Sequence, residues 1–195
     1  MAESLNTPSE KAGLPPGTLV HVGKAAAMTG QVLLIRFSAD RVEEYPVATV
    51  DDIICRHEPG TSLWVHCQGL DMVDLLTAIG QHYDIHPLVL EDILNTHQRP
   101  KFEEYEHYCF IVMKTLGCKG ALTVHHEQVA LLLLGEILFT FREQADGLFD
   151  SLRQRLFHGK SRMRTMGVDY LAYVIMDAVV DNYFAVSDVM EEAIE

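Results

Sequence analysis

The longest apolar stretch of the chain lies near its middle and is split by a turn signal. Residues 126–134 (HEQVALLLL) and 137–142 (ILFTFR) flank the pair Gly135-Glu136, which favours a hairpin between two strands. Because consecutive residues of ALLLL are apolar, both faces of that strand would be buried. A sheet that is apolar on both faces needs helices on both sides. The fold class is therefore predicted as α/β, a three-layer α/β/α sandwich with a mixed β-sheet.

Shorter patterns supply the other elements of this sandwich. Strands rich in β-branched or aromatic residues are predicted at residues 18–23, 30–37, 62–67 and 105–116. Asp71 is predicted to cap a helix that ends at His82, where apolar residues recur at helical spacing. Pro87 suits the first position of a second helix, which should end near Asn95. A third helix is predicted at residues 148–157.

The length of 195 residues suits one domain with an appendage. Residues 1–15 are polar and rich in Pro and Gly, and are predicted to form a flexible leader. The α/β/α domain is predicted at residues 16–165, and the start of a long acidic helix at residues 166–195. No Pro or Gly interrupts the pattern from Val168 onward, and no capping Gly closes it. We therefore expect the chain to be a piece of a longer protein.

The acidic residues are concentrated in that terminal helix. The net charge of the chain is −13, and residues 169–195 contribute seven acidic and no basic side chains. At about 100° per residue, five of them share one face: Asp177, Asp181, Asp188, Glu192 and Glu195. The other side is predicted to be apolar, with Leu171, Ile175, Val179, Val186, Val189, Met190 and Ala193. The acidic face fits either plain solvation or attraction of cations, since stacked like charges repel.

The composition excludes several classes of protein. A chain this acidic is a poor candidate for binding nucleic acid or an anionic membrane surface. The long apolar run is interrupted by Glu136 and falls short of the roughly 18 to 20 residues of a spanning helix. The N-terminus does not resemble a signal peptide. Four cysteines without CxxC spacing favour reduced thiols in a cytosolic protein.

The most informative stretch is residues 86–101 (HPLVLEDILNTHQRPK), which places the adjacent acids Glu91 and Asp92 on a helix. Adjacent carboxylates on a helix point about 100° apart, so each would serve a different ion or partner. This block closely resembles the N-terminal cytosolic domain of the CorA family of magnesium and cobalt transport proteins. The resemblance extends to PGTLVHVG, FIVMK, EQVALLL and DYLAYVIMDAVVDNYF, and covers nearly the whole chain from Pro16 onward.

The resemblance implies an α/β/α domain followed by long helices that descend to the membrane. It implies a homo-oligomer, a pentamer around one pore, with the transmembrane helices beyond residue 195. The full-length protein would lie in the inner membrane with this domain on the cytoplasmic face. The chain alone would be soluble, in contact with the membrane only through the absent helices, and a monomer or a weak oligomer. No catalytic residue, enzyme activity or nucleic-acid partner is implied.

The resemblance also implies metal ligands. Glu91, Asp92 and Asp177 match positions at which the family binds divalent cations between neighbouring subunits. Asp92 would serve a first site with an acid beyond residue 195, and Glu91 and Asp177 a second site. The implied regulatory ligand is Mg²⁺, or Co²⁺, and Mg²⁺ is a hard cation held by carboxylates and water. High cytosolic Mg²⁺ would bridge the subunits and keep the pore shut, and low Mg²⁺ would let them separate.

Other assignments stay open at the level of the sequence. The same domain would serve a ZntB-like zinc transporter, and the acidic face would serve a stand-alone soluble module that binds divalent cations. A site with softer ligands would require the fold to bring Cys55 and His57 together with His66 and Cys67. No catalytic triad spacing or phosphate-binding loop is present, so an enzyme is the weakest alternative.

Overall fold

The computed structural model describes residues 15, 17–20, 22, 30–119, 123–144, 147–158 and 161–194 of the chain. The strands are β1 (Gln31–Phe37), β2 (Val42–Pro46), β3 (Ser62–Gln68), β4 (Lys101–Glu104), β5 (Cys109–Lys119), β6 (Thr123–Leu134) and β7 (Ile137–Arg142). The helices are α1 (Val50–Ile54), α2 (Val73–His82), α3 (Pro87–Leu94), α4 (Asp150–Phe157) and α5 (Arg162–Ile194).

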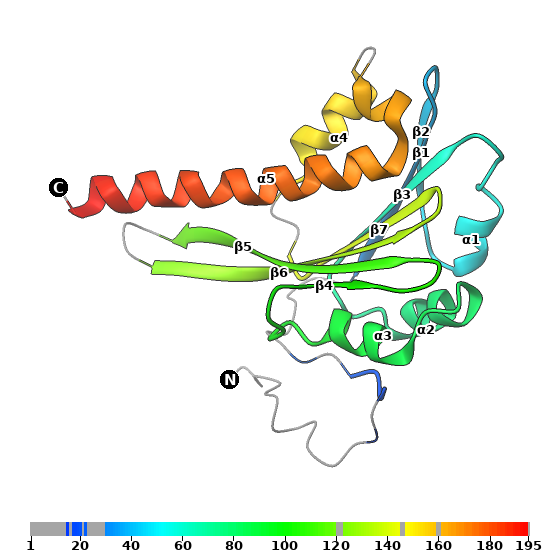
Figure 1. The fold of residues 1–195 in the computed structure, drawn as a ribbon, viewed down its shortest axis with the longest axis horizontal. Helices are drawn as coiled ribbons and strands as arrows, with labels where there is room; N and C mark the ends of the chain where they lie inside the picture. The colour runs from blue at the N-terminus through cyan, green and yellow to red at the C-terminus, as the bar shows by residue number, and fades with distance from the viewer. Residues whose placement is uncertain are drawn as a thin grey trace.

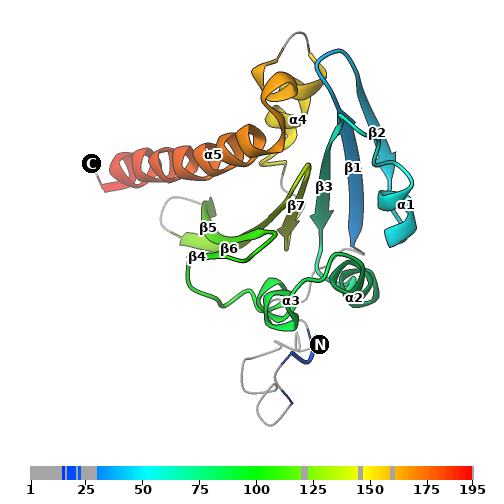
Figure 2. The same cartoon turned by 45° about the vertical axis from the view of Figure 1, so that its right-hand side comes forward.

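The strands form one seven-stranded sheet in the order β2-β1-β3-β7-β6-β5-β4. β3 and β7 pair in parallel and the other neighbouring strands pair antiparallel, so the sheet is mixed. α2 and α3 cover one face of the sheet, and α4 and α5 cover the other, as two views show (Figure 1, Figure 2). The predicted three-layer α/β/α sandwich is therefore confirmed.

Alternate residues of β6 face the two helical layers. Val129 and Leu131 pack with the buried side chains of α4 and α5, whereas Ala130 and Leu132 pack with those of α2 and α3. All four residues are at most 1% exposed. Burial on both faces explains why this strand shows no alternation of polar and apolar residues.

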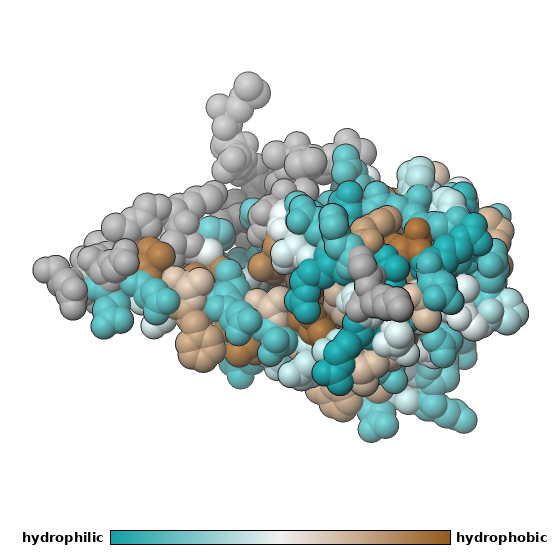
Figure 3. Space-filling model, turned by 90° about the horizontal axis from the view of Figure 1, so that it is seen from above, coloured by the Kyte–Doolittle hydropathy of each residue, from teal (hydrophilic) through white to brown (hydrophobic). Residues whose placement is uncertain are grey.

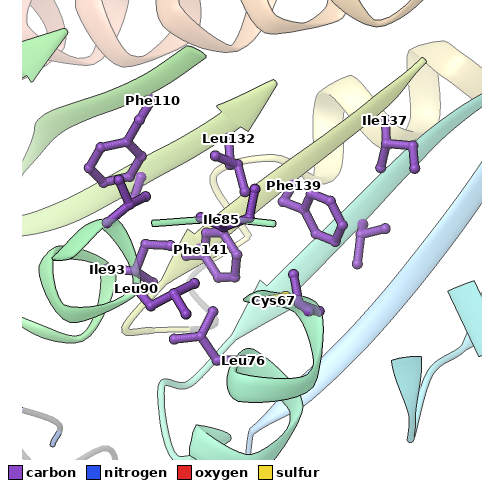
Figure 4. Packing of buried hydrophobic residues seen from close by; sticks show 14 of the residues in the cluster. Cys67, Leu76, Ile85, Leu90, Ile93, Phe110, Leu132, Ile137, Phe139 and Phe141 are labelled. Atoms are coloured by element: carbon purple, nitrogen blue, oxygen red, sulfur yellow. The ribbon is translucent and has the colours of Figure 1, made fainter. Parts of the chain in front are cut away.

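The layer of α2 and α3 docks through large apolar side chains. Leu76 of α2 and Leu90 and Ile93 of α3 point toward the sheet, where they meet aromatic residues of β5 and β7 (Figure 4), and Ile79 of α2 is buried in the same cluster. Full burial of one such side chain contributes roughly 1.5–3 kcal/mol. This packing fixes the position of α3, which carries two of the predicted ligands.

The opposite layer is dominated by α5. Leu171, Ile175 and Val179 are fully buried against the sheet, in a cluster that includes Trp64. Gly167 has φ 74° and ψ −164°, which separates the first turn of α5 from the regular helix that begins at the next residue. A side chain at this positive φ would be strained. The start at Val168 agrees with the sequence pattern.

The far half of β5 is held to α5. β5 is much longer than its neighbour β4, so its later residues lie at an open edge of the sheet. Asn182 Oδ1 accepts hydrogen bonds from Thr115 Oγ1 at 2.8 Å and from the Leu116 N–H at 3.1 Å. The Tyr183 hydroxyl donates to the Lys114 carbonyl. These bonds satisfy backbone groups of the edge and align α5 with the hairpin of β5 and β6.

Two predicted features are wrong. Residues 18–20 form no strand, and Val22 makes a single bridge to Asn95, while residues 21 and 23 lie outside the described residues. α2 begins at Val73 with Met72 at the N-cap position, so Asp71 does not cap it. Of the predicted leader, only residue 15 is among the described residues.

Three short elements escape the sequence pattern. β2 and β4 are the edge strands, and their charged residues (VEEYP and KFEE) hide any apolar alternation. α1 is only five residues long. The strand predicted at residues 105–116 begins at Cys109, because residues before it form the turn from β4, in which the Tyr105 N–H donates to the Tyr108 carbonyl at 2.9 Å.

Candidate functional site

Helix α3 carries two of the three predicted metal ligands, Glu91 and Asp92. Pro87 lies in its first turn, and His86 Nδ1 accepts a hydrogen bond from the Leu88 N–H at 3.2 Å. Both features favour a helix start at this point, as the sequence predicts. The apolar side of α3 is buried under the sheet, so both acids lie half-buried at its flanks.

The Glu91 carboxylate is engaged by the N-terminal segment of the chain. Its Oε2 accepts a hydrogen bond from the Gly17 N–H at 2.7 Å. Gly17 has φ +81°, and a Cβ atom there would lie 3.0 Å from Cβ of Pro87. The segment can therefore approach α3 this closely only because residue 17 is glycine.

The Asp92 carboxylate is held by two donors from the loop and strand that follow α3. Lys101 Nζ lies 2.6 Å from Asp92 Oδ2, and Gln98 Nε2 lies 2.6 Å from Asp92 Oδ1. The same ammonium lies 2.8 Å from Glu103 Oε1 and 5.3 Å from the centre of the Phe110 ring. Asp92 is thus one of two carboxylates that share a lysine.

Burial of Lys101 by itself would lower the pKa of its ammonium. Its hydrogen bonds and its charge attraction to Asp92 and Glu103 act in the opposite sense and together outweigh the burial, so this pKa is raised above its ordinary value. Lys101 is therefore charged throughout the neutral range. Lys101 is the last residue of the HQRPK block, but its contacts could not be predicted from the sequence, because the sequence pattern does not predict β4.

Asp177, the third predicted ligand, lies on α5. Its side chain is exposed, and neither it nor the exposed Asp181 has a hydrogen bond or ion pair among the described residues. α5 and α3 lie on opposite faces of the sheet (Figure 1, Figure 2). One chain therefore brings Glu91 and Asp92 side by side but places Asp177 in a different layer.

The outer face of α5 is less uniformly acidic than the sequence predicts. Phe184 is 66% exposed and Tyr173 is 55% exposed, and both lie among the carboxylates. Figure 3 views this side and shows apolar side chains interspersed with hydrophilic ones along α5. Val189 and Met190, predicted on the buried side, are also exposed. The side chains of Glu192, Ala193 and Glu195 lie outside the described residues.

Softer metal ligands do not gather in the described part of the chain. His66 and Cys67 are consecutive in β3, and their side chains face opposite sides of the sheet. His66 Nδ1 lies 2.7 Å from Thr140 Oγ1, whereas Cys67 packs in the apolar cluster under α2 and α3. Burial raises the pKa of the Cys67 thiol well above its usual range, and Cys55 is exposed at the end of α1.

A complete metal site is not formed by the described residues of one chain. No group of three or more His, Cys, Asp or Glu side chains within the described ranges could hold a metal ion. The same ranges contain no helix with an apolar stretch long enough for a bilayer crossing.

Comparison with known proteins gives a family match. A family model described as "CorA-like Mg2+ transporter protein" matches residues 60–195. The cobalt/magnesium transport protein CorA of Thermotoga maritima is 36% identical over 188 residues, which are 96% of this chain and 53% of that protein. The chain thus spans about half the length of this relative.

Solved structures match at the level of the fold. The soluble domain of CorA from Methanocaldococcus jannaschii has a TM-score of 0.60 and 16% identity, over 82% of this chain and 60% of that one. The cytoplasmic domain of ZntB from Vibrio parahaemolyticus has a TM-score of 0.62 and 14% identity, over 82% and 62% of the two chains. Since both identities are low, these likenesses show the fold alone.

Proposed function

Because the chain belongs to the family of CorA-like Mg²⁺ transporter proteins, we propose that it is the cytosolic, cation-sensing part of a transport protein for Mg²⁺ and Co²⁺. The family is one of divalent-cation transport proteins, not of enzymes. In this proposal the chain lies on the cytoplasmic side of the inner membrane. Several copies, five by resemblance, surround one pore that is built by helices beyond this sequence.

The observation that carries the proposal is the separation of the three acids. Glu91 and Asp92 lie on α3, and Asp177 lies on α5 across the sheet, exposed and without a partner among the described residues. A neighbouring copy can bring an α5 carboxylate to an α3 carboxylate, which a single chain does not do. The exposed aromatic side chains on α5 support this arrangement, because apolar groups of this kind are common at protein interfaces.

The chemistry of carboxylates suits Mg²⁺. This ion takes oxygen ligands, keeps several of its waters, and is usually held by one or two carboxylates. Such a site has modest affinity, as a sensor of cellular Mg²⁺ requires. Carboxylates that face one another across an interface repel when the site is empty, and a bound divalent ion turns that repulsion into a bridge.

Occupancy of these bridges would set the state of the pore. High cytosolic Mg²⁺ fills the sites, holds neighbouring copies together and keeps the pore shut, and loss of Mg²⁺ releases them. This is allosteric feedback, because the ion binds the two quaternary states with different affinity. Zinc transport is the weaker alternative, because the ZntB domain is only 14% identical to this chain, whereas the cobalt/magnesium transport protein CorA of Thermotoga maritima is 36% identical.

The test is inhibition of transport by cytosolic Mg²⁺ in the longer protein that contains this chain. Glu91→Gln combined with Asp177→Asn should raise the Mg²⁺ concentration that half-closes the pore by about tenfold, because each lost charged ligand weakens ion binding. Asp169→Asn is the matched control, since Asp169 is exposed on the same helix but lies outside the acidic face of Asp177. Equal inhibition of the double variant and the wild type would contradict the proposal.

A second measurement uses the 195-residue chain alone. Mg²⁺ should strengthen its self-association in sedimentation or light scattering, a chelator should reverse this, and Asp177→Asn should reduce it. If Mg²⁺ changed the self-association of neither the wild-type chain nor the Asp177→Asn variant, a cation bridge at Asp177 would be contradicted.

A further inference from the structure

The Lys101 ammonium lies between the carboxylates of Asp92 and Glu103, where a metal cation would otherwise bind. Its Nζ is 2.6 Å from Asp92 Oδ2 and 2.8 Å from Glu103 Oε1. Glu103 is steadied in turn by Tyr105, whose hydroxyl lies 3.1 Å from Glu103 Oε2. The other oxygen of Asp92 is taken by Gln98. In one chain, both oxygens of the proposed ligand Asp92 are therefore already in use.

We propose that Lys101 is a built-in competitor for the divalent cation at Asp92. This inference rests on the proposed function, because it concerns the regulation of the same site. Lys101 weakens the binding of Mg²⁺ to a single chain. Stable binding at Asp92 then depends on further carboxylates from a second copy, so that cation binding is linked to assembly.

Geometry makes the ammonium and the metal ion alternatives at Asp92. Mg²⁺ binds its oxygen ligands at about 2.0–2.1 Å and demands near-octahedral geometry. Asp92 Oδ2 cannot keep a hydrogen bond to Lys101 along the direction in which it binds the ion, and two cations that close repel strongly. Inner-sphere binding at this oxygen thus requires the ammonium to move away.

The competition between the Lys101 ammonium and Mg²⁺ is strong because the ion pair of Lys101 and Asp92 is partly shielded from water. The side chains of Lys101 and Asp92 are 25% and 19% exposed, so screening is weaker than for a surface pair. A charge-assisted hydrogen bond in such a setting changes an equilibrium by about tenfold or more. Lys101 should therefore weaken single-chain Mg²⁺ binding by a factor of this size.

Charge explains why a second copy overcomes the competitor. Asp92, Glu103 and Lys101 together carry a net charge of −1, and adding Mg²⁺ to them gives an excess of positive charge. Acidic groups from a neighbouring copy offset that excess and favour the ion. The ammonium has another place to bind when it leaves Asp92, because Glu103 Oε1 and the Phe110 ring both lie beside it.

The experiment is a Mg²⁺ titration of the 195-residue chain by calorimetry, with backbone NMR shifts of residues 91–94 to locate the ion. Lys101→Met, which keeps the apolar stem, should tighten Mg²⁺ binding about tenfold. Lys101→Gln, which keeps a donor without the charge, should also tighten it and serves if the methionine variant folds poorly. If Lys101 had a purely structural role, its replacement would weaken or abolish the binding of Mg²⁺ to the chain.

Lys114→Met is the matched control. Lys114 lies on the neighbouring strand β5 and is half-buried, but its Nζ bonds the Thr96 carbonyl at 2.5 Å instead of Asp92. This variant should leave Mg²⁺ binding unchanged. The double variant Asp92→Asn with Lys101→Met should lose the tighter binding, which assigns the effect to Asp92.

The outcomes separate this inference from the function on which it rests. Tighter binding in Lys101→Met that disappears in the double variant supports the inference. No tightening, while Asp92→Asn alone weakens Mg²⁺ binding in the assembled transport protein, overturns it and leaves the proposed function intact. Tightening that persists in the double variant also overturns it. No change from either Lys101→Met or Asp92→Asn overturns this inference and removes Asp92 from the proposed ligands, whereas the bridge of Glu91 and Asp177 is decided by its own transport test.

Discussion

On the α3 side of the sheet, the Asp92 side chain is 19% exposed and both of its oxygens accept hydrogen bonds from the same chain. On the α5 side, Asp177 is exposed and has no such partner among the described residues. The first carboxylate is paired with an ammonium, which it shares with Glu103, before any ion arrives, and the second is left to repel its neighbours. In the proposed function, this difference would make Asp92 a ligand whose access is regulated, and α5 a surface that a partner or a cation would complete.

The first prediction tests whether both faces belong to one cooperative domain. Ile93 of α3 and Ile175 of α5 are both fully buried, each against its own face of the sheet. Replacing either by Ala removes apolar contacts and leaves a cavity, so each should lower the free energy of unfolding by about 3 kcal/mol. Urea unfolding followed by circular dichroism measures this. A cost below about 1 kcal/mol for Ile175→Ala would mean that α5 is not part of the cooperative unit.

The second prediction concerns the attachment of α5 to the edge of β5. Asn182→Ala removes the acceptor for Thr115 Oγ1 and the Leu116 N–H, so it should cost about 1–2 kcal/mol. The Leu116 amide should then exchange with solvent faster, which hydrogen exchange by NMR detects. Asp181→Asn is the control, because its exposed side chain makes no such contact. Unchanged protection of Leu116 in Asn182→Ala would contradict this account of the edge.

The third prediction compares the two carboxylates directly in the presence of a chelator. Asp92→Asn leaves the partly buried Lys101 with one carboxylate instead of two, so it should lower the free energy of unfolding by about 1 kcal/mol. Asp177→Asn should leave it nearly unchanged or slightly higher, because it relieves repulsion from Asp181 one turn away. Thermal unfolding of both variants tests this. Equal losses would show that the two faces do not differ as described.

Long, strongly patterned elements could be predicted from the sequence. The hairpin around Gly135-Glu136, the start of α3 at Pro87 and the regular part of α5 from Val168 all appear where the patterns indicate. Each depends on local chemistry: a turn residue, a fixed φ angle, or a helical repeat of apolar side chains. The edge strands β2 and β4 were missed, since strands with one open edge tolerate charged residues and show no clear period.

The candidate site could be predicted only in part. The resemblance selected Glu91, Asp92 and Asp177 by their positions in motifs, and their role as metal ligands stays a prediction. Gly17 as a donor to Glu91 was missed, because 74 residues separate the two. Lys101 was seen only as part of a motif, although it is nine residues from Asp92, because its contact depends on where β4 places it.

The sequence alone determined the fold class, the family and the concentration of acid on the terminal helix, since periodicity, motif and charge are written along the chain. Only the tertiary structure decided that Asp92 forms an ion pair with Lys101 and that Asp177 lies on the opposite face of the sheet (Figure 1). It also decided that aromatic side chains are exposed beside the acids of α5. The physical reason is that a carboxylate's state depends on which charges lie within a few ångströms of it. That distance is set by how strands and helices pack.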